Sequence, residues 1–203
     1  MAPKQRPGRS TQNYATPDLF IQAVKARFDI THFVMDLAAG RRNTKALKFF
    51  TEEDDALRQT WPCGGWNWLN PPYAHLGDWV EKAYTEALRG VQTLMLVPAS
   101  VGANWWRDWV HEKASVLFLN GRLAFMPDKP KWLYPKDCVL LVYESPRTID
   151  NDNLYAPKWY DVWDWKPDPG RCLSSLCPSI PVTGSVYCLV HAVSLNPGKP
   201  LTA

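Results

Sequence analysis

Hydrophobic and polar positions along this 203-residue chain switch repeatedly between strand-like and helix-like patterns. Short apolar runs bounded by Gly, Pro or Asp indicate buried strands, and apolar residues spaced three and four apart indicate amphipathic helices. Strands that alternate with helices predict an α/β sandwich. The predicted strands are 33–39, 46–50, 66–69, 93–97, 116–119, 122–126 and 139–143, and the predicted helices are 18–28, 52–59, 76–88 and 104–113.

The end of this alternating region predicts a domain boundary. Connections rich in Pro, Lys and Asp join the last three strands, which favours an antiparallel hairpin at the end of an otherwise mostly parallel sheet. After Ser145 the apolar periodicity fades and Pro and Asp recur. We therefore expect four parts: a flexible basic arm (1–13), the α/β domain (14–145), a connector rich in Trp, Pro and Asp (146–170), and a cysteine-containing module with the tail (171–203).

Composition and charge narrow the function only slightly. A hydrophobic content of 46% and a charged content of 21% are ordinary for a globular protein. The net charge of +3 permits nucleic-acid binding but does not demand it. The chain contains no run of eighteen apolar residues and no secretory signal, so the sequence predicts neither membrane insertion nor export.

The stretch Asn70-Pro71-Pro72-Tyr73 carries the clearest chemistry. Two prolines fix the backbone and remove its hydrogens, so the Asn70 side-chain oxygen and a backbone carbonyl can converge as acceptors. The Tyr73 ring lies beside them. This arrangement suits a planar group that carries an NH2, because two acceptors take its hydrogens while the ring stacks on its face. The turn follows the predicted strand 66–69, and ligands bind at the carboxyl ends of strands in open α/β sheets.

Several further blocks accompany this turn, and together they resemble the phage-type DNA N6-adenine methyltransferase family. The resemblance runs from about residue 14 to residue 143. In chain order the blocks are Tyr14-Ala15-Thr16-Pro17, Asp36-Leu37-Ala38-Ala39, Phe50-Thr51-Glu52-Glu53-Asp54-Asp55-Ala56-Leu57, Trp68-Leu69-Asn70-Pro71-Pro72-Tyr73, Leu96-Val97-Pro98-Ala99 and Gly121-Arg122-Leu123.

The resemblance implies a Rossmann-like class I methyltransferase sandwich that uses S-adenosylmethionine to methylate adenine N6 in double-stranded DNA, with base flipping. It also implies a bacterial cytoplasm as the setting, with the protein encoded by a phage or prophage. The implied catalytic residues are Asn70, Pro71, Pro72 and Tyr73. The implied cofactor-binding residues are Tyr14, Thr16, Pro17, Asp36, Ala38, Glu53, Asp54 and Asn70.

Two of the cofactor contacts have a chemical rationale. The Asp36 carboxylate ends the first predicted strand and can pair with the cofactor's ammonium group. An acid that follows the second strand can accept both ribose hydroxyls, and Glu53 and Asp54 are the favoured acids. The alternative for these acids is stabilisation of a helix N-terminus. By resemblance the Thr16 hydroxyl faces the cofactor carboxylate, although Thr-Pro alone is an ordinary helix start.

Contacts with the target base and with DNA are expected further along the chain. Pro98, Ser100 and Asn104 follow a strand end and could line the base pocket. Arg122 could approach a phosphate, or it could be an ordinary surface cation. A basic and aromatic loop resembles a DNA-contact surface, with a solvated hairpin tip as the alternative; its residues are Lys129, Lys131, Trp132, Tyr134 and Lys136.

A cluster of cysteines near the C-terminus fits a structural zinc ion. Three cysteines and a histidine form two close pairs across a short turn-rich loop, and four protein ligands leave no open position for catalysis. Reduced cysteines in a tail, or a disulfide, are the alternatives. Cys63 and Cys138 are expected to be core thiols. The predicted zinc ligands are Cys172, Cys177, Cys188 and His191.

Other functions remain open from the sequence. The same chemistry could act on cytosine N4, on an RNA base or on a protein glutamine, because each presents an NH2 with similar geometry. A non-catalytic nucleic-acid-binding zinc protein is a different class. The order of the blocks and the mild basic charge favour DNA adenine.

Overall fold

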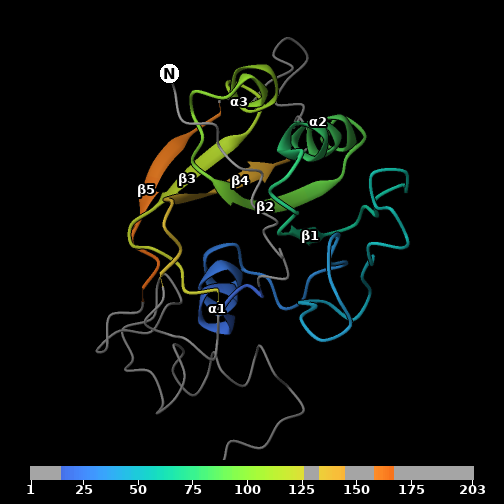
Figure 1. The fold of residues 1–203 in the computed structure, drawn as a ribbon. Coiled ribbons are helices and arrows are strands. Elements are labelled where there is room, and N and C mark those ends of the chain that lie inside the picture. Colours follow the sequence, from blue (N-terminus) through green and yellow to red (C-terminus); the bar gives the residue numbers. More distant parts are fainter. Residues whose placement is uncertain (1–14, 126–132, 145–157, 167–203) are drawn as a thin grey trace, which may run out of the picture.

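The computed structural model describes residues 15–125, 133–144 and 158–166, which form three helices and five strands (Figure 1). The helices are α1 (Asp18–Arg27), α2 (Leu76–Ala87) and α3 (Asn104–Trp109). The strands are β1 (Trp66–Leu69), β2 (Gln92–Pro98), β3 (Ser115–Leu119), β4 (Cys138–Tyr143) and β5 (Tyr160–Trp163). None of the helices in these ranges is long and apolar enough to cross a membrane.

The strands form one mixed sheet in the order β1-β2-β4-β3-β5. β1 pairs with β2 in parallel and β3 pairs with β5 in parallel, whereas β4 runs antiparallel to both of its neighbours. Four strands therefore share one direction and β4 opposes them. The predicted α/β class, the mostly parallel sheet and the antiparallel pairing of the strands around 116–119 and 139–143 are confirmed.

Helices cover both faces of the sheet, with α1 on one face and α2 and α3 on the other (Figure 1). Strand β2 shows how the sequence divides between the two faces. Leu94 and Leu96 pack into the cluster that includes α1, and Met95 and Val97 pack into the cluster under α2 and α3. Because side chains alternate along a strand, a continuous apolar run such as 93–97 is required when both faces are buried.

The two predicted strands ahead of β1 are shorter than expected. Within 33–39 and 46–50, only Asp36 and Phe49 form a bridge, and Asp36 also bridges Trp68 of β1. The prediction of two full strands was therefore wrong, although both segments lie beside each other and Asp36 lies beside β1. The connection between them is short, and the Asp36 carboxylate accepts a hydrogen bond from the Lys45 backbone N–H at 2.8 Å, which closes the chain into a tight loop instead of a longer ladder.

The predicted helix 52–59 is a series of turns. Asp55 has a left-handed backbone (φ 49°), which an α-helix does not accommodate. The Asp54 carboxylate binds the Thr51 N–H at 2.7 Å, and the Trp61 indole N–H binds the Ala56 carbonyl at 2.8 Å. Side chains thus form hydrogen bonds with backbone N–H and C=O groups that would pair with each other in a helix.

Three other predictions need correction. Helix α3 ends at Trp109 instead of Lys113, and Glu112 beyond it has a positive φ of 60°. The described part of 122–126 contains no strand, although Leu123 is buried. Cys63 is exposed and lies beside the glycine turn ahead of β1, while Cys138 is buried as expected.

Strand β5 was not predicted. It lies at the edge of the sheet beside β3, and three of its four residues are exposed.

Candidate active site

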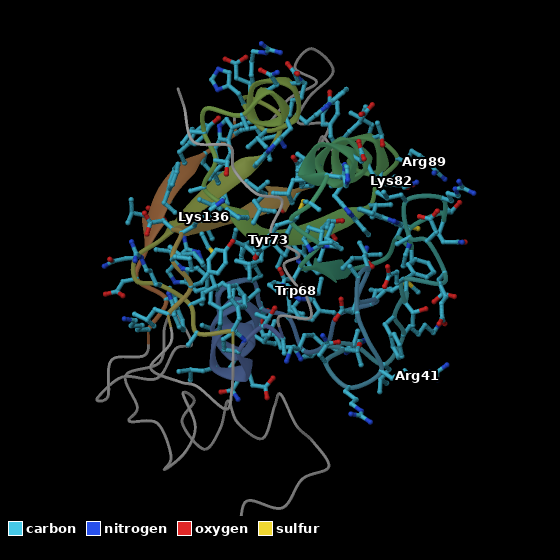
Figure 2. All side chains as sticks on the ribbon, viewed as in Figure 1. Arg41, Trp68, Tyr73, Lys82, Arg89 and Lys136 are labelled. Atoms are coloured by element: carbon cyan, nitrogen blue, oxygen red, sulfur yellow. The ribbon has the colours of Figure 1, made fainter. Side chains whose placement is uncertain are left out.

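The turn Asn70–Tyr73 begins where β1 ends, at the end of the sheet where the parallel strands have their carboxyl ends. Asn70 and Tyr73 are half-buried and Pro71 is buried. In Figure 2, Tyr73 lies near the centre of the molecule and Trp68, from β1, lies close to it in the view. This location is the one at which α/β sheets bind ligands.

Three side chains form a hydrogen-bonded series at this turn. The Tyr73 hydroxyl donates to Asn70 Oδ1 at 3.2 Å, and Asn70 Nδ2 donates to Thr16 Oγ1 at 3.2 Å. Thr16 is 3% exposed and lies directly before α1, 54 residues ahead of Asn70 in the chain. The structure therefore brings together the Thr16-Pro17 turn and the Asn70–Tyr73 turn, two blocks that the sequence singled out separately.

Asp36 lies on the neighbouring segment at the same end of the sheet, bridged to Trp68 of β1. Its side chain accepts hydrogen bonds from the Lys45 N–H at 2.8 Å and from the Ala38 N–H at 3.4 Å. Only 2% of the residue is exposed. Burial raises the pKa of the Asp36 carboxyl group to about 6, against the lowering effect of these hydrogen bonds and of the Lys45 charge. A cationic ligand bound beside Asp36 would therefore stabilise the ionised form of its carboxyl group.

The acids after Phe49 are exposed, in contrast to Asp36. Glu53 and Asp54 both have exposed side chains. Asp54 Oδ2 accepts hydrogen bonds from the Thr51 N–H at 2.7 Å and from the Thr51 hydroxyl at 2.8 Å, and these bonds lower the pKa of Asp54. Both acids are therefore accessible to a ligand.

Tyr134, which the sequence analysis assigned to the basic and aromatic loop, lies beside Tyr73 of this turn. Its ring lies edge-on to Tyr73, with ring centroids 5.8 Å apart, and against Phe125 at 5.4 Å. Tyr134 is 8% exposed, so its expected place in an exposed basic and aromatic loop is wrong. The apolar alternation of Leu123 and Phe125 was a signal that this segment enters the core, because both residues are buried.

The residues expected near the target base and the DNA lie at the same end of the sheet. Pro98 ends β2 and is buried, Ser100 is half-buried, and Asn104 is exposed at the start of α3. Arg122 is exposed and forms an ion pair with Asp137 at 3.3 Å. Lys136 is exposed and, in the view of Figure 2, lies on the β5 side of Tyr73.

Gly121 has a left-handed backbone (φ 94°), and a Cβ there would meet the end of the Lys166 side chain at 2.9 Å. Lys166 is a further cation at this end of the sheet, in addition to Arg122 and Lys136, and the sequence analysis did not single it out. It follows β5, the strand that was not predicted.

Several predicted site residues lie outside the described residues, so their placement stays a prediction. In 15–125, 133–144 and 158–166, no group of three or more His, Cys, Asp or Glu residues could hold a metal ion. The predicted site residues outside these ranges are Tyr14 at the cofactor site, Lys129, Lys131 and Trp132 at the DNA interface, and the zinc ligands Cys172, Cys177, Cys188 and His191.

Comparison with known proteins agrees with the chemistry of this site. Residues 5–144 match the family model described as DNA N-6-adenine-methyltransferase (Dam). A DNA N-6-adenine-methyltransferase of Escherichia phage T1 is 24% identical over 171 residues, which are 82% of this chain and 71% of the relative. One from Haemophilus phage HP1 (strain HP1c1) is 29% identical over 115 residues, 56% of this chain and 65% of the relative. No solved structure matches the chain significantly.

Proposed function

The chain belongs to the DNA N-6-adenine-methyltransferase (Dam) family, and from this membership we propose that the Asn70–Tyr73 turn is the site at which it methylates adenine N6 in double-stranded DNA. The observation that carries this assignment is the Asn70 side chain, which is held between Thr16 and Tyr73 at the carboxyl end of β1. An amide oxygen held at this position is an acceptor suited to an exocyclic amino group.

The residues beside this turn fit S-adenosylmethionine. The cofactor carries an ammonium group, a carboxylate and two ribose hydroxyls, and the buried Asp36 carboxylate is a suitable partner for the ammonium. Glu53 and Asp54, exposed after Phe49, are acceptors suited to the ribose hydroxyls. The Tyr14 to Pro17 turn and Ala38 complete the proposed cofactor site. When bound, S-adenosylmethionine supplies a methyl group that its sulfonium has already activated.

Asn70 and Pro71 prepare the nucleophile. The adenine amino nitrogen is a poor nucleophile because its lone pair is delocalised into the ring. The Asn70 side-chain oxygen and the Pro71 carbonyl accept its two hydrogens, which favours a more tetrahedral nitrogen and frees the lone pair. As positive charge develops on this nitrogen, the same two oxygens stabilise it. The rigid backbone at Pro71 and Pro72 holds both acceptors in place.

Tyr73 captures the base. An adenine inside a duplex cannot reach the site, so the enzyme rotates it out of the stack, and an aromatic ring replaces part of the stacking that is lost. The Tyr73 ring stands at the turn, supported at its edge by Tyr134. Ser100, which follows β2, and Asn104, which begins α3, are proposed to line the pocket for this base.

We extend the proposal to the fold and to the accessory contacts. A Rossmann-like class I methyltransferase arrangement agrees with a sheet covered on both faces and with a site at the strands' carboxyl ends. Arg122, Lys129, Lys131 and Trp132 are the proposed DNA contacts, since cations and aromatic rings bind phosphates and bases. The cysteine cluster at 172–191 is proposed as a structural zinc site. We place the reaction in the cytoplasm of a bacterial host.

The test is nucleoside mass spectrometry of unmethylated double-stranded DNA after incubation with the full chain and S-adenosylmethionine. We expect N6-methyladenine from the wild type, almost none from Asn70→Ala, and wild-type amounts from Thr85→Ala, an exposed substitution on α2. Cofactor affinity, measured by calorimetry, should change much less than turnover in Asn70→Ala. N4-methylcytosine as the product, or methylation only of RNA or of protein glutamine in parallel reactions, would contradict the assignment.

A further inference from the structure

The hydroxyl of Thr16 contacts the side chain on which the proposed chemistry depends. Asn70 Nδ2 donates to Thr16 Oγ1 at 3.2 Å, and on its other side Asn70 Oδ1 accepts from the Tyr73 hydroxyl at 3.2 Å. The Asn70 amide group therefore has a different partner at each end. By resemblance alone, Thr16 was expected to face the cofactor carboxylate, so this contact with Asn70 is a second role for the same hydroxyl.

The direction of the Asn70 amide matters for the reaction. An asparagine side chain has one acceptor end, the oxygen, and one donor end, the NH2. Only the oxygen can accept a hydrogen from the adenine amino group. If the amide rotated by half a turn, it would present a second NH2 to the substrate, and two donors would face each other. Some group must therefore hold the nitrogen away from the base.

The two hydroxyl groups have different preferences for the two ends of the amide. A phenol is a more acidic hydroxyl than an aliphatic alcohol, so the Tyr73 hydroxyl is the stronger donor and matches Asn70 Oδ1. The lone pairs on the Thr16 hydroxyl oxygen are not delocalised into an aromatic ring. This oxygen is therefore the better acceptor and matches Asn70 Nδ2. When a base enters, the Tyr73 hydroxyl can give up its hydrogen bond to Asn70 Oδ1, while Thr16 Oγ1 still accepts the hydrogen bond from Asn70 Nδ2.

Thr16 itself is well anchored. It is buried, and it directly precedes Pro17, whose backbone (φ −58°, ψ 136°) forms the start of α1. The Pro17 carbonyl accepts the Ile21 N–H at 3.1 Å, and Phe20 and Val24 fix the helix in the core. The Thr16 hydroxyl is therefore buried at the start of a helix that is packed in the core.

We propose that Thr16 is a positioning residue that holds the Asn70 amide with its oxygen toward the adenine amino group. The proposal rests on the proposed function of Asn70. It assigns to the turn ahead of α1 a role in catalysis that is separate from cofactor binding.

The test compares Thr16→Val, which keeps the branched shape and removes the hydroxyl, with Thr16→Ser, which keeps the hydroxyl. Thr16→Val should lower kcat at saturating cofactor on the order of tenfold, as expected for one lost hydrogen bond in a site. The Kd for S-adenosylmethionine is measured in parallel, and kcat is compared at saturating cofactor because the same hydroxyl is also proposed to face the cofactor carboxylate. Thr16→Ser should restore most of the lost turnover. If Thr16→Val does not fold, Thr16→Ala gives the same comparison.

Two outcomes would overturn the proposal. In the first, Thr16→Val weakens cofactor binding while kcat at saturation equals that of the wild type, which would make Thr16 a cofactor ligand only. In the second, Thr16→Ser is as slow as Thr16→Val although both are folded, which would show that the hydroxyl is not needed.

A readout without activity separates this inference from the proposed function. The Asn70 side-chain NH2, identified in NMR spectra by its loss in Asn70→Ala, should exchange with solvent more slowly in the wild type than in Thr16→Val. Equal exchange in both proteins would contradict the positioning role. If the wild type instead makes no methyladenine, the proposed function fails, even when this difference in exchange is present.

Discussion

The ring of Tyr73 packs edge-on against the ring of Tyr134, with centroids 5.8 Å apart and planes inclined by 60°. Tyr134 in turn meets Phe125 at 5.4 Å, and its backbone N–H donates to the Leu123 carbonyl at 2.8 Å. Leu123, Phe125 and Tyr134, far from the turn in sequence, therefore support the aromatic ring of the Asn70–Tyr73 turn.

This contact predicts a defect in base capture when Tyr134 is replaced. Tyr134→Leu removes the edge-to-face partner of Tyr73, and such a pair is worth about 0.5–1.5 kcal/mol beyond its buried area. We expect KM for DNA to rise roughly three- to tenfold, while the Kd for S-adenosylmethionine is unchanged. Tyr134→Phe keeps the ring and serves as the matched control. Steady-state kinetics with both variants would contradict the prediction if Tyr134→Leu changed only cofactor binding.

Asp36 predicts that cofactor affinity depends on pH. Burial raises the pKa of its carboxyl group to about 6, and only the ionised form pairs with the cofactor ammonium. Affinity should therefore approach its maximum near pH 7 and fall at lower pH as the carboxyl group becomes protonated. Titration with one pKa near 6 makes the affinity at pH 5 about tenfold weaker than at pH 7.

The measurement is calorimetric titration with S-adenosylmethionine from pH 5 to pH 8. Asp36→Asn should bind more weakly at pH 7 and should lose the pH dependence between 5 and 7. Glu53→Gln is the comparison. Removing an acid that binds the ribose hydroxyls should weaken cofactor affinity but should leave its pH dependence between 5 and 7 unchanged. A wild-type affinity that does not change with pH would contradict the pairing of Asp36 with the ammonium group.

Tyr73 combines two functions that substitutions can separate. Its ring is proposed to stack on the flipped base, and its hydroxyl donates to Asn70 Oδ1 at 3.2 Å. Tyr73→Phe should retain base capture and change kcat no more than about fivefold, since one neutral hydrogen bond contributes about 1 kcal/mol. Tyr73→Ala should raise KM for DNA on the order of tenfold or more, because base–aromatic stacking is worth about 1–3 kcal/mol.

Fluorescence of 2-aminopurine placed at the target adenine can report the flipped base directly. The signal should increase on binding to the wild type and to Tyr73→Phe, and it should increase much less with Tyr73→Ala. Equal increases for Tyr73→Ala and the wild type would show that the ring does not hold the base.

The zinc prediction concerns residues 171–203 and can be tested by metal analysis. We expect about one zinc ion per full-length chain, since four protein ligands complete a tetrahedral site. Cys177→Ser should lose most of this zinc, whereas Cys138→Ser should keep it because Cys138 is a buried thiol of the sheet. A wild-type protein purified without chelators that contains no zinc would contradict the prediction.

The sequence predicted most of the sheet and the two longer helices because these elements carry strong patterns. β2 and β4 are apolar on both faces, and α2 has a clear apolar side. Prediction from the sequence failed where local side-chain hydrogen bonds determine the backbone conformation. At 52–59, acids in the first turn resemble a helix start, yet Asp54 binds back to Thr51. It also missed β5, because exposed residues such as Tyr160 and Val162 give a strand no buried face to reveal.

The candidate site was predictable to the extent that it lies at strand ends. Asp36 and Asn70 were both predicted at strand ends, and the Asp36–Trp68 bridge shows that these ends are neighbours in the sheet. The contact between Thr16 and Asn70 was not predictable, because it depends on how α1 docks on the sheet. The burial of Tyr134 was missed for a similar reason. The surrounding segment also contains Lys131, Lys136 and Asp137, and only the packing of distant segments shows that the ring points into the core.

A buried acid on α2 provides a stability prediction that is independent of the active site. The Glu86 side chain is 2% exposed and is paired with Lys82 at 2.7 Å and with Arg89 at 3.2 Å. Lys82 is itself mostly buried and lies over the Trp61 ring at 5.8 Å. Glu86→Ala would leave the Lys82 charge without its partner. Because the loss of one partner of a buried ion pair costs about 3–5 kcal/mol and Arg89 is exposed, we expect a loss of roughly 2–3 kcal/mol in the free energy of unfolding.

Chemical denaturation of the wild type and Glu86→Ala measures this loss. The double variant Lys82→Met/Glu86→Met is the matched control, since it removes both charges and should be more stable than Glu86→Ala. Glu86 is ten residues beyond the start of α2, about 15 Å along the helix, so kcat of the folded enzyme should not change. If the double variant were as unstable as Glu86→Ala, the loss would come from packing around Trp61 and not from the unpaired charge.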